Sequence, residues 1–268
     1  KVMFLLPVLL TMAIIPISVM GTHRPLGEIL SDLSEKTRVQ TNIPRWDYLM
    51  TQFRVITTYI RLLFFPANQN LDYDYPIYRS LFTPAVFGSF MFLLAIFGMG
   101  VYLYYRSRGE VGGGRSEDGG LCLEPHTSGL YRIAAFGIFW FFITLSVESS
   151  VIPIADVIFE HRLYLPSVGA FIAIVTSLFL LTERLGKRWK GTQRIVAAAL
   201  ALIVIVFTGA TYARNRVWQD EATLWQDVVT KSPQKGRGYI NLGYAYYYEK
   251  GWPDRAIASL RKGMSLTP

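Results

Sequence analysis

The sequence predicts an all-α protein in two parts, a polytopic helical membrane domain at residues 1–213 and a shorter helical tail at residues 214–268. Hydrophobic residues make up 51% of the chain and charged residues only 17%, whereas soluble domains carry roughly 25% charged residues. The apolar residues are gathered in runs long enough to cross a bilayer. The tail is polar, with apolar residues at helical spacing. These observations favour membrane-spanning helices followed by a water-exposed helical segment.

About five apolar runs are predicted to span the membrane, at residues 2–20, 84–105, 130–147, 165–181 and 195–213. Their lengths match a hydrocarbon core of about 30 Å at a rise of about 1.5 Å per residue. Pro7 and Pro16 in the first run are interpreted as packing kinks. Because the chain opens directly in this run and ends within a repeat pattern, we expect it to be part of a longer protein and inactive by itself.

Between the first two runs, residues 46–65 are predicted to form an amphipathic helix that lies in the membrane interface. Arg54 and Arg61 fall on its polar face, opposite a face of phenylalanine, isoleucine and leucine residues. A guanidinium group can bind a phosphate with two parallel hydrogen bonds. These arginines therefore bind either lipid headgroups in general or one lipid-linked phosphate. Asp72 and Asp74, which follow, are interpreted as part of a solvated loop rather than as a cation site.

The charge pattern indicates an orientation in the membrane and no nucleic-acid partner. The net charge is +8, but the basic residues do not form a patch interleaved with aromatic residues. The short loop at residues 183–194 carries five Lys or Arg residues, which places it in the cytoplasm by the positive-inside rule. The segments at 21–80 and 152–164, and everything after residue 214, are then expected on the opposite side.

The segment at residues 141–169 joins two apolar runs and carries five ionisable residues in or beside apolar sequence: Glu148, Asp156, Glu160, His161 and Arg162. Such groups are costly at membrane depth and usually face a protein interior or an aqueous cavity. We therefore predict the candidate site here. Two interpretations stay open for Glu160, His161 and Arg162, which either bind substrate or hold the turn as a structural ion pair.

The tail matches the pattern of one tetratricopeptide repeat, a unit of two packed helices. The motif positions are occupied by Tyr239, Leu242, Gly243 and Tyr246 in the first helix and by Ala256, Leu260 and Pro268 in the second. Gly243 is expected where the two helices cross closely, and residues 221–233 resemble the second helix of a degenerate repeat. Repeat arrays form concave surfaces that bind extended peptides or proteins, so a protein partner is predicted for this part.

Residues 149–170, SSVIPIADVIFEHRLYLPSVGA, resemble the membrane domain of the transmembrane-and-tetratricopeptide-repeat family of O-mannosyltransferases. The family segment ends in an ER-x-LY-[ML]-PS-x-G pattern. The matching residues are Glu160, Leu163, Tyr164, Pro166, Ser167 and Gly169. His161 and Arg162 depart from the animal pattern, and the sequence FEHRLYLPS resembles the bacterial branch, as does RNRVWQDEATLWQDVV at residues 214–229.

The resemblance implies a GT-C glycosyltransferase, a many-pass α-helical enzyme whose donor is a sugar linked to polyprenyl phosphate. In that class the catalytic carboxylate lies in the first external loop, so the catalytic residue is expected upstream and none is assigned in this chain. An acceptor hydroxyl attacks the anomeric carbon while cations stabilise the leaving phosphate. The candidate phosphate-binding residues are Arg162, His161, Arg54 and Arg61, with Glu160 orienting Arg162 or His161.

Cysteine and histidine usage predicts no metal site. Cys122 is the only cysteine, and His23, His126 and His161 are far apart in the sequence. A divalent cation held by Glu160 and His161 stays an alternative, disfavoured because adjacent residues on a helix point apart. No other cofactor is implied besides the lipid-linked sugar donor.

These features predict a membrane glycosyltransferase acting on a protein outside the cytoplasm, with membrane lipid, a polyprenyl-phosphate sugar and an acceptor protein as partners. The alternative is a membrane-anchored repeat scaffold without catalytic activity. A transporter is disfavoured because the sequence contains no inverted repeat of broken helices. The expected location is a bacterial inner membrane with periplasmic repeats, or the endoplasmic reticulum membrane with lumenal repeats if the source is eukaryotic.

Overall fold

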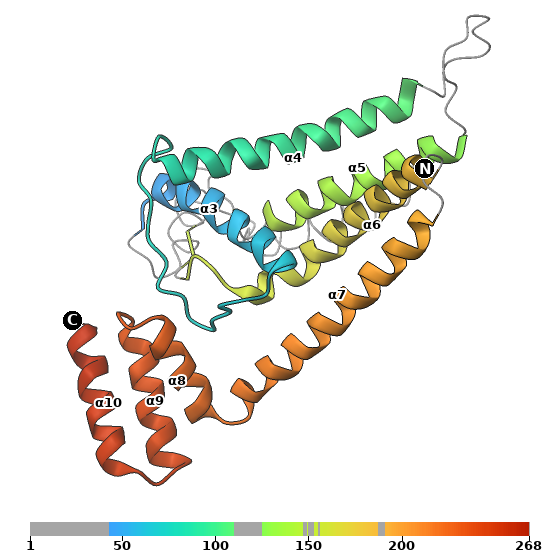
Figure 1. Ribbon diagram of the computed structural model, residues 1–268. Helices are drawn as coiled ribbons and strands as arrows, with labels where there is room; N and C mark the ends of the chain where they lie inside the picture. The colour runs from blue at the N-terminus through green and yellow to red at the C-terminus, as the bar shows by residue number, and fades with distance from the viewer. Residues whose placement is uncertain are drawn as a thin grey trace, which may run out of the picture.

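The computed structural model describes residues 43–109, 125–146, 149, 153–154, 156–186 and 191–267. Within these ranges the chain forms helices and connecting loops and no β-strand. In chain order the elements are α3 (Arg45–Phe64), α4 (Pro84–Gly109), α5 (Pro125–Ser146), the 3₁₀ helix η2 (Glu160–Leu163), α6 (Tyr164–Gly186), α7 (Thr192–Asn215), the 3₁₀ helix η3 (Arg216–Trp218), α8 (Glu221–Lys231), α9 (Gly236–Tyr248) and α10 (Pro253–Leu266). Figure 1 shows α4, α5 and α6 running alongside one another, while α7 diverges from α6 toward α8–α10.

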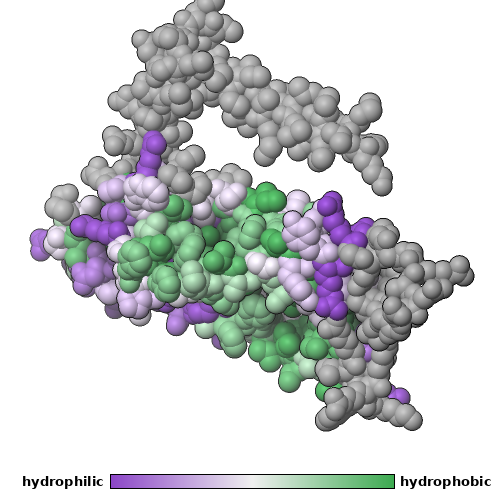
Figure 2. All heavy atoms as spheres, turned by 90° about the horizontal axis from the view of Figure 1, so that it is seen from above, coloured by the Kyte–Doolittle hydropathy of each residue, from purple (hydrophilic) through white to green (hydrophobic). Residues whose placement is uncertain are grey.

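Four helical segments are long and apolar enough to cross a membrane: Pro84–Arg108, Thr127–Ser146, Glu160–Glu183 and Arg194–Trp218. They confirm four of the predicted apolar runs. The remaining run, at residues 2–20, lies outside the described residues, as do Glu148 and Pro268. On the face that carries α4, Figure 2 shows a band of hydrophobic side chains with hydrophilic ones at both ends. This distribution is typical of a helical membrane protein.

Two glycines bring the backbones of α5 and α6 into contact. A Cβ atom at Gly137 would lie 2.5 Å from the carbonyl oxygen of Gly169, and one at Gly169 would lie 2.6 Å from that of Gly137. Small residues permit such close helix packing in membranes. The indole N–H of Trp140 also donates to the carbonyl oxygen of Leu165 at 3.1 Å. The start of α6, which carries the motif, is therefore fixed against α5.

One side of α3 belongs to the core of the membrane part, together with residues of α4, α5 and the turn before α6. The hydroxyl of Tyr59 donates to the carbonyl oxygen of Phe159 at 2.9 Å, and the side-chain amide of Gln52 donates to that of Val157 at 3.0 Å. Both side chains are buried or nearly so. Hence α3 fixes the segment that leads into Glu160.

The loop between α3 and α4 folds back over the polar side of α3. The hydroxyl of Thr51 accepts a hydrogen bond from the backbone N–H of Tyr78 at 2.9 Å, and the hydroxyls of Thr58 and Tyr75 lie 3.0 Å apart. The prediction of a solvated loop is wrong at Asp72, which is only 2% exposed. The reason is that cations from the C-terminal helices cover its carboxylate, as described below.

α7 packs differently from the other spanning helices. Its most apolar stretch has no buried residue within the described structure. Side chains such as Leu202, Val204 and Ile205 are exposed along its length. Such an all-round apolar helix needs lipid or other protein around it. In the described part of the chain, α7 contacts α6, and its C-terminal end is held by the bond from Arg214 to Asp227 of α8.

The C-terminal helices α9 and α10 form an antiparallel hairpin that packs against α8. A Cβ atom at Gly243 would lie 2.6 Å from the side chain of Leu260, so the two helices cross closely at this glycine. Tyr239 and Leu242 form a small core with Val229 of α8. This geometry is compatible with the repeat pattern, whose assignment as a tetratricopeptide repeat stays a prediction.

Candidate functional site

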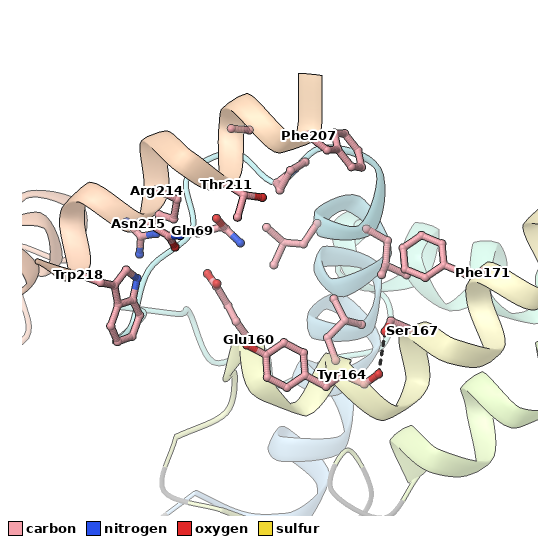
Figure 3. A pocket seen from close by; sticks show the side chains of 15 residues that line it. Gln69, Glu160, Tyr164, Ser167, Phe171, Phe207, Thr211, Arg214, Asn215 and Trp218 are labelled. Carbon is pink, nitrogen blue, oxygen red and sulfur yellow. Dashed lines mark hydrogen bonds between the residues drawn. The ribbon is translucent and has the colours of Figure 1, made fainter. Parts of the chain in front are cut away.

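A cleft with a volume of about 630 Å³ lies between the end of α3, the start of α6 and the end of α7. Its apolar wall includes Leu63, Phe171 and Phe207. Its polar lining comes from Gln69, Glu160, Tyr164, Ser167, Thr211, Arg214 and Asn215. Figure 3 shows the α7 side chains facing Glu160 and Tyr164 across this space. A cleft with one apolar and one polar part suits a ligand that has a polar head and an apolar chain.

The carboxylate of Glu160 points into the cleft (Figure 3). Its Oε1 atom accepts a hydrogen bond from the Tyr73 hydroxyl at 2.6 Å and another from the Asn70 backbone N–H at 2.7 Å. Burial and the hydrogen bond to Glu160 raise the pKa of Tyr73 well above its usual value, so the phenol stays protonated and donates. The other oxygen, Oε2, receives no hydrogen bond from the described residues and is available to a ligand hydroxyl.

Arg214 is the only Lys or Arg among the described residues that line the cleft. Its Nη1 donates to Oδ2 of Asp227 at 2.6 Å, and Nζ of Lys231 donates to the same oxygen at 2.8 Å. Burial alone raises the pKa of Asp227, but the hydrogen bonds from Lys231 and Arg214 outweigh it and hold that pKa below its usual value. Two cations therefore share one carboxylate, which leaves a net positive charge at this edge of the cleft.

A group of four charged side chains, Asp72, Asp156, Lys235 and Arg237, joins the membrane part to the start of α9. We call this group the charge clamp. Arg237 binds Asp156 with two hydrogen bonds, of 3.0 and 2.9 Å, and its Nε donates to Asp72 at 2.8 Å. Lys235 also binds Asp72, and it donates to Asp156 at 3.3 Å. The hydrogen bond to the Asp72 carboxylate raises the pKa of Arg237 above its ordinary value. The C-terminal helices are thus anchored at the cleft end of the bundle.

The residues of the predicted Glu160, His161 and Arg162 group point in different directions. Glu160 lines the cleft, and no ion pair or hydrogen bond joins it to His161 or Arg162 in the described structure. The ring of His161 stacks on the ring of Phe159 at a centroid distance of 5.0 Å. The guanidinium of Arg162 lies 5.0 Å from the centroid of the same ring. Of these three residues, only Glu160 is among the described residues that line the cleft.

The two arginines predicted on α3 lie beside the cleft rather than in its lining. Arg61 is exposed at the end of α3, next to the lining residues Leu62 and Leu63, and its Nη1 lies 3.4 Å from the carbonyl oxygen of Ala67. Arg54 lies two turns earlier and is half-buried. Arg61 therefore lies closer than Arg54 to the end of α3, which borders the cleft.

A second cavity, with a volume of about 440 Å³, is lined almost entirely by apolar side chains of α3, α4, α5 and α6. Leu63 lines both cavities, and on α6 the lining passes from Phe171 in the first to Ala170 in the second. The apolar path along α6 therefore continues beyond the cleft toward the opposite end of the span.

No cluster of three or more His, Cys, Asp or Glu side chains suited to a metal ion is found in the part of the chain that the structure describes. The divalent cation considered for Glu160 and His161 stays a prediction. One oxygen of Glu160 is occupied by Tyr73 and Asn70, and the ring of His161 is stacked on Phe159.

Four residues that shape this site were not identified from the sequence: Asn70, Tyr73, Arg214 and Ser232. Arg214 carried a usable signal, because it directly follows an apolar run and opens the family-like segment at residues 214–229. The sequence holds no comparable signal for Asn70, Tyr73 or Ser232. They stand in short polar segments whose partners lie 87 to 162 residues away.

Two curated proteins of Drosophila melanogaster are similar to this chain. "Protein O-mannosyl-transferase Tmtc3" is 29% identical over 101 residues, which is 38% of this chain and 11% of that protein. "Protein O-mannosyl-transferase Tmtc1" is 33% identical over 109 residues, which is 41% of this chain and 12% of that protein. No family model and no solved structure matches the chain.

The chain thus matches about one-eighth or less of the length of these relatives. The similarity supports the resemblance to the transmembrane-and-tetratricopeptide-repeat family that the motif indicated. The assignment to a bacterial branch and to the GT-C type remains a prediction.

Proposed function

We propose that this chain is part of an integral membrane glycosyltransferase that transfers a sugar from a polyprenyl-phosphate donor to a protein acceptor. The observation that carries this proposal is the two-sided cleft, with apolar side chains of α6 and α7 on one wall and Glu160 and Arg214 at its polar end. A lipid-linked sugar phosphate has the matching polarity. Mannose is the sugar to test first, because both relatives are named as protein O-mannosyl-transferases.

In this proposal the polyprenyl chain lies against the apolar wall and the phosphate lies near Arg214. Arg54, Arg61, His161 and Arg162 remain the other candidates for phosphate binding. The acceptor hydroxyl attacks the anomeric carbon, the bond from that carbon to the phosphate oxygen breaks, and a carboxylate takes the hydroxyl proton. Positive charge stabilises the leaving phosphate. Glu160 accepts a hydrogen bond from a sugar hydroxyl through Oε2 and so orients the donor.

The proposed side of the reaction is the extracytoplasmic one. The start of α6, the α3–α4 loop and the C-terminal helices all lie at one end of the bundle, whereas the end of α6 and the start of α7 lie at the other (Figure 1). The basic residues predicted to face the cytoplasm belong to that connection. A protein held by the C-terminal helices would therefore share a compartment with the polar end of the cleft.

The test is sugar transfer by the full-length protein in lipid nanodiscs, with polyprenyl-phosphate mannose as donor. Glu160→Gln is expected to lower kcat/KM for the donor about a hundredfold, since a lost contact to the reacting sugar typically costs this much. Glu183→Gln, at the opposite end of α6, is the matched control and should transfer at the wild-type rate. Wild-type turnover by Glu160→Gln would remove the cleft carboxylate from the site.

The same assay separates the enzyme from the scaffold alternative. If the wild-type full-length protein transfers no mannose from any polyprenyl-phosphate donor but still captures proteins through its C-terminal helices, the scaffold is the better description. Transfer that survives deletion of the C-terminal helices with unchanged KM for the acceptor would contradict their proposed role in acceptor binding.

A further inference from the structure

In the loop between α3 and α4, Asn70 bonds both to the cleft residue Glu160 and to the C-terminal helical part. This side chain is 3% exposed, although it lies outside regular secondary structure. Buried polar groups require hydrogen-bond partners, and Asn70 finds them in two distant segments. Its backbone N–H donates to Oε1 of Glu160 at 2.7 Å, and its side-chain Nδ2 donates to Oγ of Ser232 at 2.8 Å.

Ser232 is the counterpart of Asn70 in the connection between α8 and α9. It is 2% exposed. Besides the bond from Asn70, its Oγ atom accepts a bond of 2.9 Å from the backbone N–H of Asp74. A single buried hydroxyl therefore holds two points of the loop, on either side of Asp72 and Tyr73.

The charge clamp surrounds these bonds and joins the same three segments. Lys235 and Arg237, at the start of α9, bind Asp72 of the loop and also Asp156. Asp156 stands four residues before Glu160. Residues 69–74, 156–160 and 231–237 thus form one hydrogen-bonded unit, which we call the junction.

We propose that Asn70 and Ser232 are positioning residues for Glu160. Through them, the position of the C-terminal helices relative to the membrane part determines where the Glu160 carboxylate lies in the cleft. This inference rests on the proposed function, which takes Glu160 as a donor-binding group. Both groups that hold Glu160 in place, the Asn70 N–H and the Tyr73 hydroxyl, belong to the loop that Ser232 anchors. A protein that shifts α8 and α9 on binding would therefore change the donor site, rather than only being tethered near it.

Ser232→Ala tests this link, because it removes both loop bonds and leaves Glu160 and its two donors unaltered. Two readouts apply to the full-length protein in nanodiscs: amide hydrogen exchange of the segments containing residues 69–74 and 158–163, and kcat for sugar transfer. We expect faster exchange in both segments and a kcat about tenfold lower, which is the effect of losing roughly one positioning hydrogen bond. Ser265→Ala, an exposed serine on α10 that bonds only within its own helix, should change neither.

Asn70→Ala removes the bond to Ser232 from the other partner, together with the bonds that the Asn70 side chain makes to the Asp72 backbone, and it keeps the backbone N–H that reaches Glu160. The inference predicts that Asn70→Ala changes exchange and kcat in the same direction as Ser232→Ala. The double variant should be less affected than the sum of the two single variants, because both lose the shared Asn70–Ser232 bond. If exchange rises at residues 69–74 but not at 158–163, and kcat is unchanged, the link is overturned. If the wild-type protein transfers no sugar, the proposed function fails instead, and the exchange data alone decide whether the junction positions Glu160.

Discussion

The helices α6 and α7 have similar length and apolar character, yet they are held in different ways. α6 packs along α5, where Gly169 and Gly137 bring the two backbones together. On α7, a Cβ atom at Gly209 would meet nothing within 4 Å in the described structure. Apolar composition makes both helices suitable spans, but the close packing of α6 on α5 depends on the two glycines that face each other. The cleft occupies the space between the start of the packed helix and the end of the unpacked one.

The end of α7 is held instead by polar contacts. Arg214 binds Asp227 of α8, and the next helix is anchored on the membrane part through the charge clamp. One wall of the cleft is therefore fixed by glycine packing within the bilayer, and the other by ion pairs in water. Substitutions at each kind of contact can test this difference.

The largest effect is expected from Gly169→Ala compared with Gly209→Ala. At Gly169 the added methyl group would meet backbone oxygen at 2.6 Å, and such overpacking costs about 1–3 kcal/mol. At Gly209 there is open space, and alanine favours a helix by up to about 1 kcal/mol over glycine. Unfolding in detergent micelles should therefore show destabilisation for Gly169→Ala and none for Gly209→Ala. Equal effects would mean that α7 packs as closely as α6.

A smaller effect is expected from Asp72→Asn, which removes the charge between Lys235 and Arg237. Hydrogen bonds to charged groups contribute about 1.5–3 kcal/mol, and the lower end applies because Arg237 is 50% exposed. Spin-label distances between α3 and α8 should broaden in this variant at neutral pH.

Asp220→Asn is the matched control for this variant. Asp220 pairs with Lys250 on the surface and also caps α8 through the Thr223 N–H, and asparagine caps equally well. The α3–α8 distances should therefore stay as in the wild-type protein. Broadening of the same size in both variants would show that the clamp has no special part in holding α8 and α9.

The smallest effect is a pH response of the clamp through Asp156. Burial alone raises the pKa of this carboxyl, but the hydrogen bond from Arg237 and the charge of Lys235 outweigh it and lower the pKa. Asp72 shares both cations. Because the folded-state pKa lies below the unfolded value of about 4, the stabilisation is present above that value and is lost as the pH falls through the folded pKa.

The α3–α8 distances should consequently be the same at pH 7 and at about pH 5, and should broaden only in more acidic buffer. Asp156→Asn should weaken that acid response, because the substituted side chain cannot titrate. Broadening between pH 7 and 5 would point to a histidine or another group in place of this carboxylate.

The sequence by itself was enough to predict the helices. Four of the predicted apolar runs correspond to the four helices long and apolar enough to span a membrane. The helix predicted at residues 46–65 corresponds to α3, at Arg45–Phe64. These features depend on the length of a run and on residue spacing within one or two helical turns, so neighbouring residues contain the information. The motif also pointed to Glu160, since its ionisable side chain stands beside an apolar run.

Only the tertiary structure decided what surrounds Glu160. His161 and Arg162 are its neighbours in sequence, yet its partners are Asn70 and Tyr73, 90 and 87 residues away. The side chain of Asn70 in turn bonds to Ser232, which is 162 residues away from Asn70 in the sequence. No local pattern encodes such pairs, because they form only when helix packing brings three polar segments together and burial obliges each polar group to find a partner.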